Sequence, residues 1–317
     1  MRILILAPAL AGVLIIPYSL DAYGTLLVFT LMTNVAMAQS YNLLGGFGGQ
    51  IHLGHGAFFG IGAYVSALAA VKGFSICPSS AVACFAAGAI AWGTGFFLCR
   101  ARGASFALAS LSLLLLLGLL ARNLSGLTGG LSGLSLPLHK GTVLVTQLSI
   151  LNALASLLVN FWFARSATGL GLRAIAQDEM TPRTLGVPVK KIKARAFLVG
   201  SLLAAFSGSL YPWQVFYVSP SSAFGLEVSL SPVVMAMLGG TGTVFGPALG
   251  ALVMTVFQEW LFSSGAHFRL ALMGAVLWLL GSKFRGGLIR KIWPATKQGS
   301  HLISSWRAGS WRSGGKG

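Results

Sequence analysis

Few side chains in this sequence could carry acid–base, nucleophilic or metal chemistry. The 317 residues include only five carboxylates, five histidines and three cysteines. His52 and His55 could share one helix face, but no carboxylate or third histidine lies nearby to complete a metal site. Cys77, Cys84 and Cys99 lie in or beside apolar segments, where cysteine is typically a small hydrophobic filler. The sequence therefore predicts no enzyme and no resident metal or cofactor.

The composition explains this scarcity, because it is typical of a membrane protein. Hydrophobic residues make up 55% of the chain and charged residues 9%, whereas a soluble domain has roughly a quarter charged residues. The 42 glycines fit the same class, since small residues let membrane helices approach closely. We therefore expect an all-α integral membrane protein, a polytopic bundle of about 8–10 transmembrane helices of which some are broken or re-entrant.

The chain also lacks an energy source of its own. It contains no GxxxxGK(S/T) loop to cradle nucleotide phosphates, so any coupling to ATP must come from a partner. Ion-coupled carriers usually place an ionisable residue near the membrane centre. The carboxylates are expected elsewhere: outer loops or ends for Asp21, Glu227 and Glu259, and an inner loop for Asp178 and Glu179. Because backbone carbonyls can also hold Na⁺, an ion-coupled carrier or a passive channel stays an alternative, as does a non-transporting scaffold.

A glycine-rich segment is the first candidate for a solute path. Seven glycines lie between positions 45 and 60, and each costs a helix about 1 kcal/mol relative to alanine. Irregular backbone survives at membrane depth only where it is buried in protein or lines a wet cavity. We therefore predict that this segment lines the path, or that its glycines serve close helix packing. The predicted path residues here are Asn42, Gly45, Gly49, Gln50, His52, Gly54 and His55.

Two further sequence patterns could contribute to a solute path, one rich in glycine and one polar. Residues 238–250 repeat the LGGxG opening of residues 44–48, which adds Gly239 and Gly240 to the predicted path. The repeat could also be a coincidence of the glycine-rich composition. Asn152, Ser156 and Asn160 are spaced by four and form one polar helix face, for hydrogen bonds between helices or for solute contact.

The elements that must position these residues are read from the apolar runs. The opening run is interpreted as a first span rather than a signal peptide, because no small-x-small cleavage pattern follows it. The run near 228–240 is too short to cross a bilayer straight and is expected to be a half-helix or re-entrant. The candidate spans are 3–20, 24–44, 53–71, 80–98, 104–121, 142–163, 196–213, 228–240, 245–262 and 268–282.

The charge distribution predicts the orientation of these spans. With both termini cytoplasmic, 18 Lys and Arg residues fall inside and only Lys72, Arg122, Lys140 and Arg269 outside. The net charge of +17 thus reports topology, and nucleic acid is not an expected partner. Residues 1–282 form the predicted transmembrane domain. Residues 283–317 form a basic cytoplasmic tail that is expected to be disordered or to lie on anionic membrane lipid.

The longest inner loop, residues 164–195, contains a predicted amphipathic helix. Leu172, Ile175, Ala176 and Met180 could bury one face, and Pro182 would stop or restart the helix. Such a helix is the docking element expected for a separate ATPase, although the loop could instead be a solvated basic segment that only sets topology. The predicted coupling residues are Arg173, Ala174, Asp178, Glu179 and Gly186.

At these motifs the chain resembles the permease subunits of branched-chain amino acid ATP-binding-cassette (ABC) importers. A GxxGQxxxGHxAFxGxGAY pattern is similar to Gly45 through Tyr64, and an LRAIxxDExxAxxLGI pattern is similar to residues 172–187. Further similarity lies at Thr128–Leu134 and Met237–Gly250. The loop departs from the family pattern at Thr181–Arg183, which leaves the length of the docking helix open.

The resemblance implies a subunit in a bacterial inner membrane that works by alternating access. The implied partners are a second related permease, two cytoplasmic ABC ATPases and a periplasmic solute-binding protein. The implied solute is a branched-chain amino acid, with urea, a short amide or another small organic solute as the alternative.

Overall fold

The computed structural model describes residues 16–137 and 141–260. The predicted span 268–282 and the predicted tail 283–317 lie outside the described residues. So does most of the predicted span 3–20, whose last residues include a 3-10 turn.

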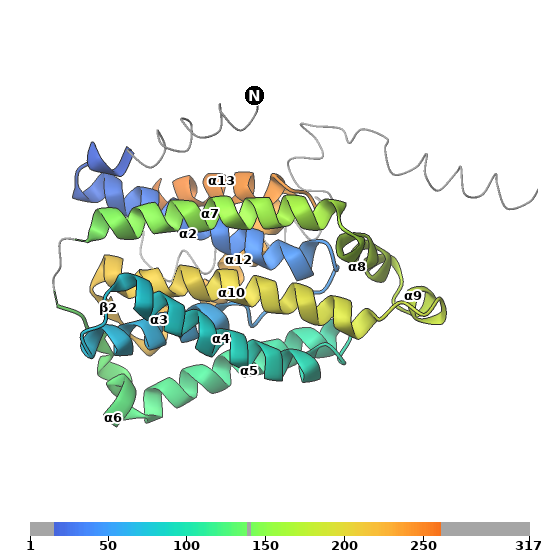
Figure 1. The fold of residues 1–317 in the computed structure, drawn as a ribbon, viewed down its shortest axis with the longest axis horizontal. Helices are drawn as coiled ribbons and strands as arrows, with labels where there is room; N and C mark the ends of the chain where they lie inside the picture. The colour runs from blue at the N-terminus through green and yellow to red at the C-terminus, as the bar shows by residue number, and fades with distance from the viewer. Residues whose placement is uncertain (1–15, 138–140, 261–317) are drawn as a thin grey trace, which may run out of the picture.

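The described chain is almost entirely helical (Figure 1). Its elements are η1 (Ile16–Tyr18), α2 (Ala22–Tyr41), the π-helical turn η2 (Asn42–Gly46), α3 (Gly56–Val71), α4 (Ile76–Leu98), α5 (Gly103–Asn123), α6 (Ser125–Thr128), η3 (Gly130–Ser132), β1 (Leu134–Ser135), α7 (Thr142–Arg165), α8 (Ala167–Gln177), α9 (Met180–Thr184), α10 (Val189–Val215), β2 (Tyr217–Val218), α11 (Pro220–Phe224), α12 (Leu226–Gly239) and α13 (Gly246–Trp260).

Within the described ranges, five helical segments are long and apolar enough to cross a membrane: α4, α5, α7, α10 and the combined segment Pro220–Gly239. The helix α3 is a shorter apolar helix of 16 residues. The expected short helix near 228–240 is present as α12, of 14 residues, and a break at Gly225 separates it from α11, with which it makes up the 20-residue segment. The prediction of an all-α polytopic membrane protein is confirmed.

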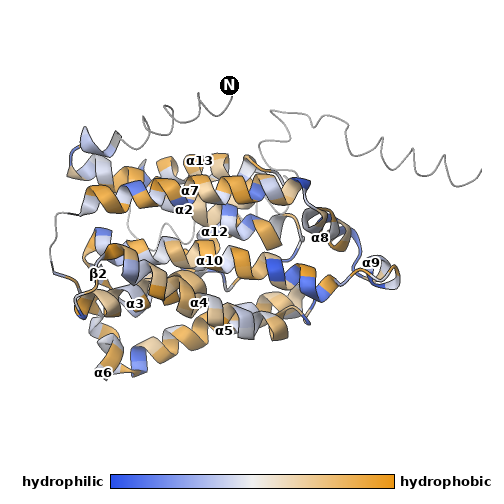
Figure 2. Cartoon of the chain, viewed as in Figure 1, coloured by the Kyte–Doolittle hydropathy of each residue, from blue (hydrophilic) through white to orange (hydrophobic). Residues whose placement is uncertain are grey.

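The long helices run along a common direction and define two ends of the molecule (Figure 1). We call the end that carries α8 and α9 the α8–α9 end. The opposite end, where β2 and α6 are labelled and where α11 follows β2, is the α11 end. Among the described Lys and Arg residues, only Lys72 and Arg122 lie at the α11 end. Figure 2 shows the hydrophilic residues gathering at the start of α10 and beside α9, while the helix bodies are hydrophobic. The charge asymmetry expected of a membrane protein is therefore present in the fold.

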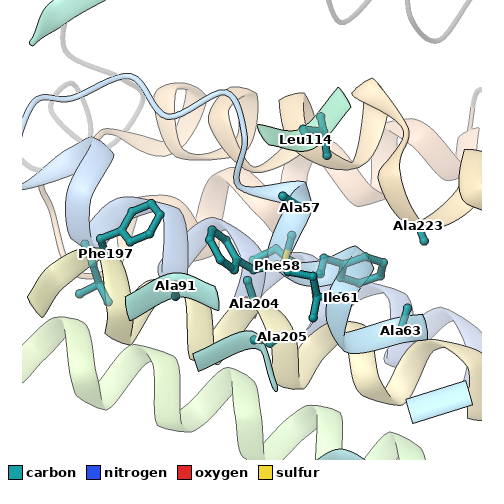
Figure 3. Close-up of a cluster of buried hydrophobic side chains, with 14 of the residues drawn as sticks. Ala57, Phe58, Ile61, Ala63, Ala91, Leu114, Phe197, Ala204, Ala205 and Ala223 are labelled. Atoms are coloured by element: carbon teal, nitrogen blue, oxygen red, sulfur yellow. The ribbon is translucent and has the colours of Figure 1, made fainter. Parts of the chain in front are cut away.

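The core lies where α3 packs against α10 (Figure 3). The ring of Phe58 meets that of Phe197 edge to face, with 5.3 Å between the ring centroids. Around them, alanines including Ala57, Ala204 and Ala205 are fully buried. A Cβ on Gly62 would lie only 2.1 Å from the carbonyl oxygen of Ala205. Small residues thus allow the close backbone approach that holds membrane helices together.

The α11 end is closed by a small antiparallel pair, in which Leu134 of β1 lies opposite Val218 of β2. The backbone amide of Leu136 also donates to the carbonyl of Phe216, at 2.9 Å. These short strands fix the connection between α5 and α7 against the connection between α10 and α11.

Candidate functional site

The two glycine-rich segments, far apart in the sequence, touch each other in the fold. Asn42 is fully buried, and its amide nitrogen donates to the carbonyl of Thr243 at 2.9 Å. Its amide oxygen accepts from the backbone amide of Gly242, also at 2.9 Å. A Cβ on Gly46 would lie 1.8 Å from this oxygen and 2.6 Å from the Gly242 nitrogen. The two segments have similar sequences and also meet in space. The first follows α2 and the second follows α12, and both helices run towards the α8–α9 end.

The polar face of α7 joins the same junction. Asn160 accepts a 2.9 Å hydrogen bond from the Asn42 amide and donates to the Gln39 carbonyl at 2.8 Å. About two helical turns earlier on α7, the amide of Asn152 donates to the hydroxyl of Ser207 on α10 at 2.8 Å. Ser156 is buried between them. The interpretation of this face as a source of hydrogen bonds between helices is confirmed.

The chain between η2 and α3 carries the predicted polar path residues. His55 is buried, with its Nε2 2.7 Å from the Ser40 hydroxyl. His52 is buried among aromatic rings, and the centroid of its ring lies 5.1 Å from the centroid of the Phe197 ring. Within the described chain, the Nε2 of His52 and the Oε1 of Gln50 are buried without a hydrogen-bond partner. Such atoms are uncommon in folded proteins and are where water or a ligand would bind.

The remaining predicted path residues lie where space for a side chain is absent or where a helix ends. A Cβ on Gly45 would meet the Tyr41 ring, one on Gly54 the Ser110 carbonyl and one on Gly239 the Gly246 carbonyl. Gly240 has a φ of 117° and ends α12. Hydroxyls hold the same loop, since Ser110 accepts from the Leu53 amide and Ser229 accepts from the Gly56 amide, each at 3.1 Å.

The predicted amphipathic helix is present as α8, and it packs on the first glycine-rich segment. Leu172 and Ile175 are buried. The guanidinium of Arg173 lies 5.2 Å from the centroid of the Phe47 ring. A Cβ on Gly49, whose φ is +62°, would lie 3.0 Å from the Cβ of Ala176. The helix therefore contacts the segment that leads into the junction at Asn42.

Two details of the loop differ from expectation. Ala176 and Met180 were predicted to be buried, but both are exposed. The helix also ends at Gln177, before Pro182, because Asp178 is extended. The carboxylate of Asp178 accepts from the amides of Met180 and Thr181 and starts the short helix α9. A hydrogen bond from the Thr181 hydroxyl, together with these amides, lowers the pKa of Asp178 below its usual value.

Glu179 is the centre of an ionic cluster rather than an exposed docking residue. Its carboxylate lies 2.7 Å from Lys193, 2.7 Å from Arg183 and 3.3 Å from Arg102. The side chain of Lys193 is fully buried, whereas that of Arg102 is 45% exposed. The cluster ties α9 to the start of α10 and to the α4–α5 connection. Arg173, Ala174, Asp178 and Gly186 remain exposed on the loop.

A cavity of about 440 Å³ lies towards the α11 end, and sequence reasoning did not identify it. None of the predicted path residues lines it. The face of α2 that forms one wall was a missed signal, because its residues recur at helical spacing and mix hydroxyl, amide and apolar groups. The lining is Leu26, Phe29, Thr30, Thr33, Asn34, Met37, Phe59, Tyr211, Val215, Ser221, Ser222, Glu227, Val228, Ser231, Pro232 and Gln258.

The described residues contain no group of three or more His, Cys, Asp and Glu side chains that could hold a metal ion. Four of the five carboxylates lie at helix ends or in loops, namely Asp21, Asp178, Glu179 and Glu227, and Glu259 lies on α13.

Known proteins with a similar sequence are membrane permeases. The high-affinity branched-chain amino acid transport system permease protein LivM of Escherichia coli K12 is 27% identical over 294 residues, covering 81% of this chain and 68% of LivM. The corresponding LivM of Salmonella typhimurium is 26% identical, with 78% of this chain and 66% of LivM covered. The chain thus spans about two thirds of these relatives.

Other relatives are named as permeases of other import systems. The autoinducer 2 import system permease protein LsrC of Klebsiella pneumoniae is 34% identical over 137 residues, which cover 42% of this chain and 39% of LsrC. No solved structure matches the chain. Residues 4–280 match the family described as branched-chain amino acid transport system / permease component. The chain therefore belongs to this family and is a multi-pass membrane permease component of an ABC transporter.

Proposed function

We propose that this chain is the translocating subunit of an ATP-driven importer of branched-chain amino acids or a similar small polar solute. In this proposal the α8–α9 end faces the cytoplasm of a bacterial cell and the chain lies in the inner membrane. The concentration of basic residues at that end supports the orientation. Two ABC ATPases, a second related permease and a periplasmic solute-binding protein complete the transporter.

The observation that carries the proposal is the contact between α8 and the chain at Phe47–Gly49. Arg173 lies against the Phe47 ring, and Gly49 has almost no space beside Ala176. The same stretch of chain continues back to Gly46, which touches Gly242. Because this contact is close-packed, a displacement of α8 is transmitted to the junction of the two glycine-rich segments.

An ATPase that pulls on the exposed side of α8 would therefore act on the path itself. Arg173 and Ala174 lie on the exposed part of α8 and are the proposed contact. Gly186 lies in the α9–α10 connection and Asp178 fixes the start of α9. Glu179 is proposed to hold the loop on α10 through Lys193, so that the loop moves as one piece.

The solute path is proposed to run from the cavity towards the junction of the glycine-rich segments. The cavity lies towards the α11 end and the predicted path residues lie closer to the α8–α9 end. On the side of the α8–α9 end, Gln50 and His52 contribute buried polar atoms without hydrogen-bond partners in the described chain. At this junction, Gly46 lies close to the Gly242 backbone and Gly239 close to the Gly246 backbone.

Purification of the tagged full-length chain from its native membrane in mild detergent tests the proposal. We expect an ABC ATPase and a second permease to purify with it in stoichiometric amounts. A chain that purifies alone, and that accumulates solute in liposomes under an ion gradient, would show that it is an independent carrier and would overturn the proposal.

A further inference from the structure

We propose that Glu227 is the ammonium-binding residue of a solute site in the cavity at the α11 end, and that this site takes a small amine with an apolar side chain. The inference rests on the proposed function and narrows the class of solute. It favours amino acids and related amines over urea and neutral amides.

The cavity has the dimensions of a binding site for a small molecule. Its volume of about 440 Å³ lies within the range of roughly 300–1,000 Å³ that is typical of such sites. Five separate elements, α2, α3, α10, α12 and α13, contribute to its wall together with α11. On α2 the lining positions 26, 29, 30, 33, 34 and 37 form one helical face, so the wall is a continuous surface.

Glu227 gives this cavity a negative charge that no other described residue of its lining balances. It is the only charged residue among the described residues that line the cavity. Every ion pair between described residues involves Glu179, so Glu227 pairs with no Lys or Arg of the described chain. Its side chain is half-buried. An unbalanced carboxylate in a partly buried cavity attracts a cation more strongly than it would in water.

The rest of the lining suits the remainder of a small amino acid. The Gln258 amide offers a donor to a carboxylate, whereas the Ser221 and Ser222 hydroxyls bond within the cap of α11. Leu26, Phe29, Met37, Phe59 and Val228 offer an apolar wall to an aliphatic side chain. A few polar groups that fix orientation, set in a mainly apolar wall, are the usual composition of a site for a small ligand.

Charged thiol reagents test the electrostatic part of the inference. Thr33→Cys places a thiol in the cavity, in a background in which Cys77, Cys84 and Cys99 are replaced by serine. In the assembled transporter, we expect a cationic methanethiosulfonate to react about tenfold faster than an anionic one, relative to a free thiol. Glu227→Gln removes this preference. Glu259→Gln, the same change beside Tyr23 at the start of α2 but outside the cavity lining, preserves it.

Uptake of leucine by the assembled transporter in proteoliposomes tests the solute class. We expect Glu227→Gln to lower ATP-dependent leucine uptake at least tenfold, with uptake by the Glu259→Gln variant close to that of the wild type. If the Glu227→Gln variant keeps the reagent preference or normal uptake, the inference is wrong and ATP-driven transport stands. If the wild-type transporter hydrolyses ATP but moves no solute, the proposed function fails, and this inference fails with it.

Discussion

Asn42 joins segments that are separated by more than a hundred residues of chain. Its side chain makes three hydrogen bonds, to Asn160, Thr243 and Gly242, and it is fully buried. Buried amide groups are costly unless they are paired, so this geometry is strongly specified. The sequence indicated that Asn42 and the glycines matter, but it could not show that they meet. That contact depends on how α2, α7 and α12 pack.

Gly46→Ala tests this junction at the scale of one methyl group. A Cβ there would overlap the Asn42 side chain and the Gly242 backbone. Overpacking of this kind costs about 1–3 kcal/mol, so we expect a lower melting temperature of the detergent-purified protein and reduced uptake. Gly93→Ala is the matched control, because no atom lies within 4 Å of its added Cβ. Equal melting temperatures for the two variants would contradict the described junction.

Lys193 and Glu179 make a second residue-level prediction. The side chain of Lys193 is fully buried, and Glu179 is its carboxylate partner at 2.7 Å. Removing one partner of a buried ion pair costs about 3–5 kcal/mol, because the other charge is left unpaired. We expect Glu179→Gln to reduce the amount of folded protein in the membrane, and Lys193→Met in the same chain to restore much of it. The absence of any rescue would show that the pair does not stabilise the loop.

At the scale of elements, the loop 164–195 shows what sequence patterns do and do not predict. Helical periodicity identified α8, since Leu172 and Ile175 point into the protein. The end of the helix was not predicted, because it depends on a local contact in which the Asp178 carboxylate accepts two backbone amides. The burial of Met180 was predicted wrongly for the same reason: the periodic pattern stops before that residue.

Ala174→Glu tests α8 as the coupling element. Ala174 is exposed, so a carboxylate there leaves the fold intact but changes the proposed ATPase contact. We expect the ATPase to be lost from the purified complex and uptake to fall more than tenfold at equal membrane abundance. Ser105→Glu adds the same charge at an exposed position on α5 at the same end and should retain both. Retention of the ATPase by the Ala174 variant would place the docking surface elsewhere.

At the scale of the whole molecule, the sequence predicted the helical class and most of the spans. Eight of the ten predicted spans fall within or beside helices of the described chain, because long apolar runs are a strong signal. The cavity was not predicted, since six elements form it and the patterned face of α2 alone does not show what lies opposite. The short span predicted near 228–240 corresponds to α12, of 14 residues, which the break at Gly225 separates from α11.

The orientation of the whole molecule is tested by labelling from one side. Leu131 at the α11 end is 78% exposed and Leu185 at the α8–α9 end is 77% exposed, so they form a matched pair. With the three native cysteines replaced by serine, we expect an impermeant maleimide to label Leu131→Cys but not Leu185→Cys in intact cells. Both should react after lysis. The reverse pattern would invert the topology and remove α8 from the cytoplasm.

ATP-dependent solute uptake is the central claim. It is measured most directly with the purified chain, its second permease, the ATPases and the binding protein together in proteoliposomes. We predict accumulation of labelled leucine that requires ATP on the α8–α9 side and that disappears in the Ala174→Glu variant. Accumulation that is driven by an ion gradient without ATP, or ATP-driven uptake that is indifferent to Ala174→Glu, would contradict the account.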